Sequence, residues 1–507
     1  MKITNIFIYV IFAAAILIRF GDALRPINQA SWRESDLGSV SRNFVREGMN
    51  PFYPRIDWRG TGPGYAEMEF PLYPWLIAAG YQVFGIHDVI GRLLSFVFSI
   101  ATLFFFFRLA RENLGGFAAI AAFAFFAFNP LVLQSSTAIQ PEGLMICTYV
   151  AAVYLFLKWL RDERDRDLWL AVIATALTLL AKATAAHIGL LFAVLLFQKY
   201  GLGTFSKGKV WLFGVLSFLP AAVWYIHAKQ LWTTYGNSLG VSNEYHWIGL
   251  DFFTNSYFIT GILKIELLQV WVIFALAVAA FGLIFGLRER IAIISMVWLS
   301  STFLLYCIAS RTTAADWASY YHIFSVPPAA LLFGFGLKKL ADFLKSWADN
   351  FSNRGLANNL MRLAFAAIFA FAALAAFMVE AKRARADIVE RRVADPSFAF
   401  ARELNPQLTN DGLILVSGGR CVDDDGYPVA YNASFMFYWL DRKGANICVQ
   451  EQSLEKVNRF AATGYKYFIA QRTFMKAMPG FEDDLLSKYK VVASNEDFEV
   501  FDLAIGK

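Results

Sequence analysis

The hydrophobic and polar positions divide the chain into a long part with repeated apolar runs and a C-terminal part without them. The first run covers residues 3–20. Ten others follow at 90–109, 116–134, 142–160, 168–181, 184–198, 209–228, 268–287, 290–309, 320–337 and 362–379. Most approach the ~20 residues that a helix needs to cross ~30 Å of hydrocarbon. The pattern predicts a mainly α-helical integral membrane protein with eleven spans, within a range of about 11–13 helices.

Residues 3–20 are predicted to remain as the first span, because no small-residue cleavage pattern follows them. A further apolar stretch, 71–85, is too short to cross a bilayer and is predicted to form an interfacial helix. We therefore divide the chain into a polytopic membrane domain, 1–380, and a C-terminal domain, 381–507.

The polar segment 21–89 is far longer than the usual connection of about 4–6 residues, which suggests a function. It is rich in acids, arginines and aromatic residues, in four groups. These are Trp32-Arg33-Glu34-Ser35-Asp36, Ser41-Arg42-Asn43-Phe44, Asn50-Pro51-Phe52-Tyr53-Pro54-Arg55-Ile56-Asp57 and Glu69-Phe70-Pro71-Leu72-Tyr73-Pro74-Trp75. Carboxylates and guanidinium groups beside apolar spans suit a site where a lipid-borne anion meets a general base. The alternative is a solvated loop with ordinary charges.

Composition supports the membrane assignment independently. The mean hydropathy is +0.46. Charged residues make up 17% of the chain, whereas soluble proteins average about 25%. The net charge of +6 is not gathered into a basic, aromatic-interleaved stripe, so no nucleic-acid partner is expected.

The basic residues predict how the spans are oriented. Alternate short loops carry most of them: Arg108, Arg111, Lys158, Arg161, Arg164, Arg166, Lys199, Lys207, Lys209, Arg288, Arg290, Lys338, Lys339 and Lys345. By the positive-inside rule these loops are cytoplasmic. The N-terminus is then cytoplasmic, and the segment 21–89 and the C-terminal domain face outward from the inner (plasma) membrane. Basic residues between 382 and 392 do not fit this pattern, but long domains translocate largely regardless of charge.

The pattern changes from about residue 393. Short strand-like runs occur at 413–416, 467–470, 491–493 and 498–501, and 453–463 has helical spacing. Some 115 residues suffice for a small α/β domain with its own core. Cys421 and Cys448 fall in this domain, where a disulfide is permitted, but spacing does not decide whether they pair. The other two cysteines, Cys147 and Cys307, are read as small core residues of spans.

Taken in order, the polar groups of 21–89 resemble a known family. They are similar to the first extracytoplasmic loop of the bacterial polytopic glycosyltransferases of the protein O-mannosyltransferase and lipid A aminoarabinose transferase superfamily. Tyr438-Trp439-Leu440-Asp441-Arg442-Lys443-Gly444 also resembles a segment that recurs in the soluble tails of these enzymes. The resemblance implies the GT-C fold and transfer of a sugar from a polyprenyl-phosphate donor, with inversion.

Such a transfer needs a carboxylate for the acceptor hydroxyl and positive charge for the departing phosphate. Asp36 is the leading candidate base, because the resembling enzymes carry an acid at this position. In the family this acid is usually part of an Asp-Glu pair, so Glu34 is the other candidate. The alternative for Asp36 is a helix-capping role.

Further candidates come from the same resemblance. Glu69 matches the Glu of the family's Glu-Lys-Pro segment, but Phe70 replaces the lysine. The candidates to replace this cation in binding phosphate are Arg33, Arg42, Arg55 and Arg59, and a structural pairing role is an equal alternative for each.

Glu142 begins a predicted span on the outer side and is a second catalytic candidate. Lys182, in a turn between two short spans, is predicted either to anchor the lipid phosphate or to snorkel to the interface. Tyr320, Tyr321 and His322 resemble the entry to a late family helix that contacts the carrier. His227 and His246 lack a diagnostic spacing, so no metal or other cofactor is predicted.

The sequence therefore predicts a membrane glycosyltransferase whose partners are a polyprenyl-phosphate sugar, membrane lipid and an extracytoplasmic acceptor. Two alternatives stay open. A transporter or flippase predicts charges at mid-membrane and inverted repeats, and neither is visible in the sequence. An O-antigen ligase or polymerase carries its large loop late, whereas this chain carries it first.

Overall fold

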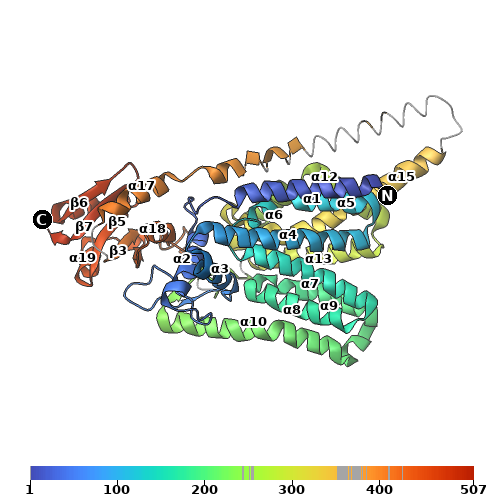
Figure 1. Ribbon diagram of the computed structural model, residues 1–507, viewed down its shortest axis with the longest axis horizontal. Coiled ribbons are helices and arrows are strands. Elements are labelled where there is room, and N and C mark those ends of the chain that lie inside the picture. Colours follow the sequence, from blue (N-terminus) through green and yellow to red (C-terminus); the bar gives the residue numbers. More distant parts are fainter. Residues whose placement is uncertain are drawn as a thin grey trace. The chain divides into compact units, whose positions relative to one another are not determined.

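The computed structural model describes residues 2–242, 245–250, 252, 256–350, 364, 367, 378–379, 381–383, 385–386, 388–408, 412–424 and 426–506 (Figure 1). The chain forms two compact units. The helical unit comprises Met1–Leu24, Leu93–Ala222 and Trp247–Glu390. The α/β unit comprises Arg25–Arg92, Val223–His246 and Arg391–Lys507, so it groups most of the segment 21–89 with the C-terminal part.

The helical unit is built from long apolar helices, and Figure 1 shows α4, α7, α8 and α9 running in similar directions. The α-helices are α1 (Lys2–Asp22), α4 (Asp88–Asn113), α5 (Gly116–Phe128), α6 (Pro130–Ser135), α7 (Glu142–Asp162), α8 (Asp165–Ala181), α9 (Ile188–Tyr200), α10 (Gly208–Tyr235), α11 (Ser256–Ile265), α12 (Ile273–Gly286), α13 (Arg290–Ile308), α14 (Ser310–Thr313) and α15 (Val326–Asn350). Three 3₁₀ segments, Ala183–His187, Gly201–Ser206 and Asp316–Ser325, lead into or out of them.

Among the described residues, six helices are long and apolar enough to cross a membrane, or seven if the bent pair described below is one span. These coincide with the predicted runs 90–109, 142–160, 184–198, 209–228, 290–309 and 320–337. The run 3–20 lies in α1, and 168–181 lies in α8, which has only 17 residues. The run 362–379 falls largely outside the described residues. The chain is thus a multi-pass membrane protein, as predicted.

Two predicted spans are not continuous helices. The run 116–134 breaks at Asn129, because the residue before a proline is disfavoured in a helix. Asn129 caps α6 by accepting from the N–H of Leu131 at 3.1 Å, and its amide donates to the carbonyl oxygens of Gln269 and Val270 at 3.1 and 3.3 Å. The second break interrupts the predicted run 268–287. A π-helical turn, Glu266–Val270, follows α11, and the chain then bends by 98° into α12.

The α/β unit contains α2 (Trp32–Glu47), α3 (Leu72–Phe84) and a mixed five-stranded sheet. The strand order is β4-β3-β5-β7-β6, in which β3 pairs in parallel with β4 and β5, while β7 pairs antiparallel with β5 and β6. The strands are β3 (Leu413–Ser417), β4 (Gly444–Ile447), β5 (Tyr465–Gln471), β6 (Tyr489–Ser494) and β7 (Phe498–Gly506). The helices of this part are α17 (Pro396–Leu404), α18 (Ser434–Leu440), α19 (Leu454–Ala462), α20 (Arg472–Lys476) and α21 (Phe481–Lys488). Two-residue strands β1 (Ala66–Glu67) and β2 (Asn237–Ser238) pair in parallel.

Alternate residues of the sheet enter two separate cores. Ile414, Val416 and Ile469 pack with α17 and α18, whereas Leu415 and Phe468 pack with α19 and α21. This alternation is expected of strands whose two faces are both covered. The predicted small α/β domain is confirmed, and Cys421 and Cys448 are joined in a disulfide.

The C-terminal part packs directly on α2 within the α/β unit. A Cβ atom at Gly38 would lie 2.7 Å from a ring carbon of Tyr438, so only glycine permits this approach. The Tyr438 hydroxyl donates to Asp88, and Arg42 lies over the Tyr438 ring, 4.9 Å from its centroid. The segment that resembles a recurring family motif therefore docks the sheet domain onto the first polar segment.

Candidate active site

The helix α2 carries the charged groups that the sequence singled out. Ser31 is its N-cap and accepts from the N–H of Glu34 at 3.2 Å, so Asp36 lies inside the helix and does not cap it. Every residue from Arg33 to Phe44 is buried. The alternative of a solvated loop is therefore wrong. A buried polar helix needs an internal partner for each charge.

Asp36 is fully buried, and its Oδ1 accepts a hydrogen bond from Trp58 Nε1 at 2.8 Å. Burial raises the pKa of Asp36 from its ordinary value of 3.8 to about 7. The Trp58 hydrogen bond and the charge of Arg33 lower this pKa in part, while the charge of Asp57 raises it. A carboxyl with a pKa near the working pH is well suited to act as a general base.

Glu34 is held differently. Its two carboxylate oxygens accept from Arg92 Nη1 and Nη2 at 2.8 and 3.0 Å, and the Arg92 side chain is fully buried. Arg92 also donates to the carbonyl oxygens of Arg25 and Pro26, at 2.8 and 3.0 Å. This bidentate pair fixes Glu34 as a partner of Arg92 and makes it a poorer base than Asp36.

Arg33 and Glu69 form a second buried ion pair, in which Arg33 Nη2 donates to Glu69 Oε1. The two candidates are therefore brought together, and their pairing links the start of α2 to the residues just before α3. The charge of Arg33 lowers the pKa of Asp36, so this ion pair is part of the electrostatic environment of the candidate base. A buried Arg–carboxylate pair can also rearrange to receive a phosphate oxygen.

A third buried pair stabilises the same helix. Arg42 Nη2 donates to Asp57 Oδ2 at 2.6 Å, and Asn43 Nδ2 donates to Asp57 Oδ1 at 2.8 Å. Asp57 precedes Trp58 in the chain, so this contact sets the position of the Trp58 indole that reaches Asp36.

Arg55 and Arg59 lie at the other end of α2. Both approach Glu47: Arg59 donates to its two carboxylate oxygens at 3.0 Å, and Arg55 donates to its carbonyl oxygen at 2.5 Å. Glu47 follows Asp36 by eleven residues, or roughly 16 Å along a helix. The structure thus does not bring these two arginines to the candidate base.

In the helical unit, Glu142 and Lys182 form a buried ion pair between the start of α7 and the end of α8. Lys182 Nζ lies over the rings of Tyr320 and Tyr321, 4.7 and 4.3 Å from their centroids. Lys182 is therefore buried and has a counter-charge, which corrects the snorkelling alternative, while its role as an anchor for lipid phosphate stays a prediction. Four predicted residues meet in one buried cluster of a cation, a carboxylate and two aromatic rings.

His322 is fully buried, with Nδ1 2.7 Å from Glu266 Oε1 and Nε2 2.8 Å from the Thr313 carbonyl oxygen. Its contact with the carrier stays a prediction. Its role is to bind Glu266 at the π-helical turn, where the chain bends.

Histidines elsewhere make ordinary contacts. His227 Nε2 lies 2.8 Å from the Phe52 carbonyl oxygen, and His246 stacks on Tyr427. No group of three or more His, Cys, Asp or Glu side chains suited to a metal ion occurs in the described part of the chain. Metal independence stays a prediction.

Sequence reasoning missed Arg92, Trp58 and Glu266 as site or support residues. Arg92 could have been found, because a charge near the start of an apolar span is costly unless it is paired. Trp58 has no such signal, since its role depends on a contact between residues that are 22 positions apart in the chain.

Comparison with known proteins agrees with this architecture. Residues 68–227 match the model of the dolichyl-phosphate-mannose-protein mannosyltransferase family. ArnT from Cupriavidus metallidurans in the apo state has a TM-score of 0.63 and 13% identity, covering 99% of this chain and 98% of ArnT. The same protein bound to undecaprenyl phosphate gives 0.63 and 15%, covering 98% of each chain.

Two other proteins also match. The Archaeoglobus fulgidus oligosaccharyltransferase in its apo form has a TM-score of 0.56 and 14% identity, covering 91% of this chain and 69% of that one. An uncharacterized Aquifex aeolicus protein is 22% identical over 161 residues, which is 31% of this chain and 32% of that relative. The match thus spans about a third of the Aquifex protein.

The chain is a multi-pass membrane protein that shares its fold with ArnT and with the archaeal oligosaccharyltransferase. The family-model match over residues 68–227 agrees with the resemblance seen in the sequence.

Proposed function

We propose that this protein is a membrane glycosyltransferase that moves a hexosyl or pentosyl group from a polyprenyl phosphate to an extracytoplasmic hydroxyl, on a lipid, a polysaccharide or a protein. The observation that carries the proposal is Asp36, a fully buried carboxyl with a pKa of about 7, oriented by Trp58. Two findings support the donor class: ArnT has been solved with undecaprenyl phosphate, and the matching family model describes transfer from dolichyl-phosphate mannose.

In the proposed reaction, Asp36 accepts the proton of the acceptor hydroxyl as its oxygen attacks the anomeric carbon. The bond between that carbon and the phosphate oxygen breaks, and polyprenyl phosphate leaves with the bonding electrons. Attack opposite the leaving group inverts the configuration at the anomeric carbon. Arg33 supplies positive charge beside the base for the departing phosphate, in place of the cation missing at Phe70.

Within the helical unit, Lys182 remains a candidate ligand for lipid phosphate. Its ammonium is already desolvated and held by Glu142, Tyr320 and Tyr321, so an arriving phosphate would meet an ordered cation. Tyr320 and Tyr321 would then act by fixing this ammonium.

The proposed function is tested by measuring which sugar donor the protein uses. Purified protein should transfer the sugar of a polyprenyl phosphate and ignore the same sugar on a nucleotide, because no nucleotide-binding fingerprint is present in the sequence. Turnover of a nucleotide sugar without lipid carrier contradicts the proposal.

We also propose that the N-terminus is cytoplasmic and the C-terminal domain lies outside the inner membrane. Reporters active on only one side of the membrane, fused at Gly60, Glu163 and Gln450, should read outside, inside and outside. The expectation follows from the basic residues at the ends of α4 and α7. A cytoplasmic reading at Gln450 would show an even number of spans between the two termini.

A further inference from the structure

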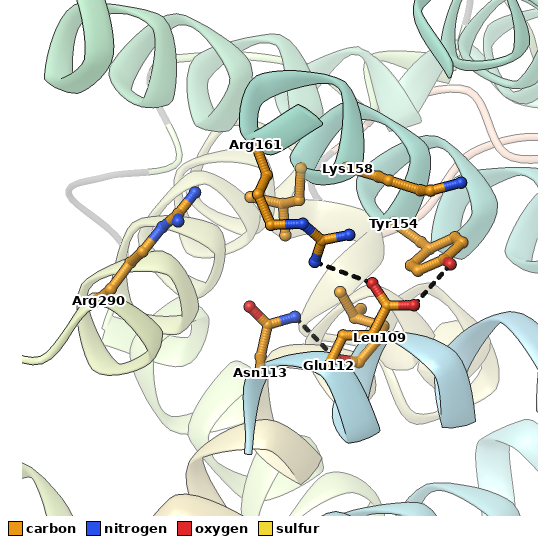
Figure 2. Close-up of a pocket in the computed structure, with 8 residues that line it drawn as sticks. Leu109, Glu112, Asn113, Tyr154, Lys158, Arg161 and Arg290 are labelled. Carbon is orange, nitrogen blue, oxygen red and sulfur yellow. Dashed lines mark hydrogen bonds and ion pairs between the residues drawn. The ribbon is translucent and has the colours of Figure 1, made fainter. Parts of the chain in front are cut away.

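A pocket of about 80 Å³ lies where the C-terminal ends of α4 and α7 meet the start of α13, all within the helical unit (Figure 2). Lys158, Arg161 and Arg290 line it, with Glu112 as the one carboxylate among the lining residues. The lining therefore has a net positive charge. Its volume exceeds the ~10–15 Å³ that a single water needs on the same measure, so the pocket can receive a small polar group.

The internal ion pairs leave part of this positive charge uncompensated. Glu112 accepts from Arg161, Tyr154 and Arg108 at 3.0, 2.9 and 2.8 Å. Arg161 also donates to Asp162 at 2.8 Å, and Lys158 binds Asp167 at 3.0 Å. Figure 2 shows Arg290 across the pocket from Arg161 and Glu112. Among the described residues, no ion pair or hydrogen bond of the Arg290 guanidinium is found.

The helix dipole accounts for the positions of only some of these cations. Lys158 and Arg161 lie in the last turns of α7, where positive side chains complement the helix dipole. Arg290 is instead the first residue of α13, where the dipole disfavours a cation. Three cations from two helices therefore line one pocket, and a bound anion would offset their charge.

The pocket is remote from the Glu142–Lys182 cluster. Glu142 begins α7 and Arg161 lies nineteen residues later, about 28 Å along the helix. This is close to the ~30 Å thickness of the hydrocarbon layer. The pocket and the cluster are therefore at opposite membrane surfaces.

We propose that this pocket binds the phosphate of an anionic membrane lipid in the leaflet opposite to the Glu142–Lys182 cluster. Arginine and lysine side chains between helices at a membrane surface are suited to lipid phosphates. The Arg290 guanidinium can donate two hydrogen bonds to a phosphate, and Arg161 and Lys158 add positive charge beside it. A lipid is favoured over a soluble anion because the pocket lies between membrane-spanning helices at the depth of headgroups.

The test uses full-length protein purified in a neutral detergent, with bound lipid counted by native mass spectrometry. Phosphatidylglycerol should bind in preference to phosphatidylcholine. The double variant Arg161→Gln/Arg290→Gln should bind phosphatidylglycerol roughly 30-fold more weakly, at about 1 kcal/mol for each cation. The control Arg111→Gln/Arg288→Gln removes the same charge from exposed positions on the same side and should bind it normally.

Three outcomes would overturn the proposal. Equal weakening in both double variants would mean attraction by net charge alone. Equal binding of the two lipids would mean that no anion is recognised. Displacement of phosphatidylglycerol by millimolar inorganic phosphate would make the ligand a soluble anion. Thermal unfolding of each variant, expected to match the unmodified protein because Arg161 and Arg290 are exposed, excludes misfolding.

Discussion

Replacing Asp36 by Asn should reduce the rate of sugar transfer at saturating donor by ~10²–10⁴, which is the usual contribution of a positioned general base. Asn has the shape of Asp, and its Oδ1 can still accept the Trp58 hydrogen bond. The substitution therefore removes basicity and leaves the packing of α2 intact. Donor binding, measured separately, should change little.

The pH dependence provides the control for this result. With a pKa of about 7, Asp36 is protonated below neutrality, so the unmodified enzyme should lose activity as the pH falls through about 7. The residual rate of Asp36→Asn should not show this step. Near-normal transfer in Asp36→Asn, together with an inactive Glu34→Gln, would move the base to Glu34.

The Asp36→Asn substitution, which lowers the activity, should not lower the resistance to thermal unfolding. Because the folded protein raises the pKa of Asp36 above 3.8, ionising this group costs stability as the pH rises from about 4 to about 7. Asn carries no such cost. At pH 8 Asp36→Asn should be at least as resistant to thermal unfolding as the unmodified protein, so its loss of activity cannot be attributed to unfolding.

Replacing Arg92 by Met should destabilise the protein by about 3–5 kcal/mol, the usual cost of leaving a buried charge without its partner. Arg92 is fully buried and is the bidentate partner of Glu34. The carbonyl oxygens of Arg25 and Pro26 would also lose their donor. The measurement is the thermal unfolding midpoint of purified protein in one detergent.

Two control variants separate the ion pair from general damage. Glu34→Met/Arg92→Met removes both charges and should be more stable than Arg92→Met alone. Arg46→Met breaks a half-exposed pair with Asp441 and should cost at most about 1 kcal/mol. A single Arg92→Met variant as stable as Arg46→Met would show that Glu34 does not depend on this partner.

The sequence predicted the parts of the fold that rest on local hydrophobic pattern. The run 142–160 became α7, and the strand-like runs of the tail became β3, β5, β6 and β7. Strand β4 was missed because Gly444–Ile447 is short and three of its four residues are polar or small. The break at Asn129-Pro130 has a local cause and could have been read from the sequence.

The candidate site was less predictable. The sequence of α2 has one apolar stripe, Leu37, Val40 and Phe44, but it gives no sign that the charged residues on its other sides are also buried. Its burial depends on Arg92 and Glu69, which lie 58 and 36 residues from their partners in the chain. Asp36 was identified by resemblance, but its raised pKa results from tertiary burial that no local pattern encodes.

The most direct test of the account is a single-turnover assay that compares two donors carrying the same sugar, one on a polyprenyl phosphate and one on a nucleotide. We expect transfer from the lipid donor only, with inversion at the anomeric carbon, and a rate ~10²–10⁴ lower in Asp36→Asn. Transfer from the nucleotide sugar, or a retained anomeric configuration, or full activity in Asp36→Asn would contradict it.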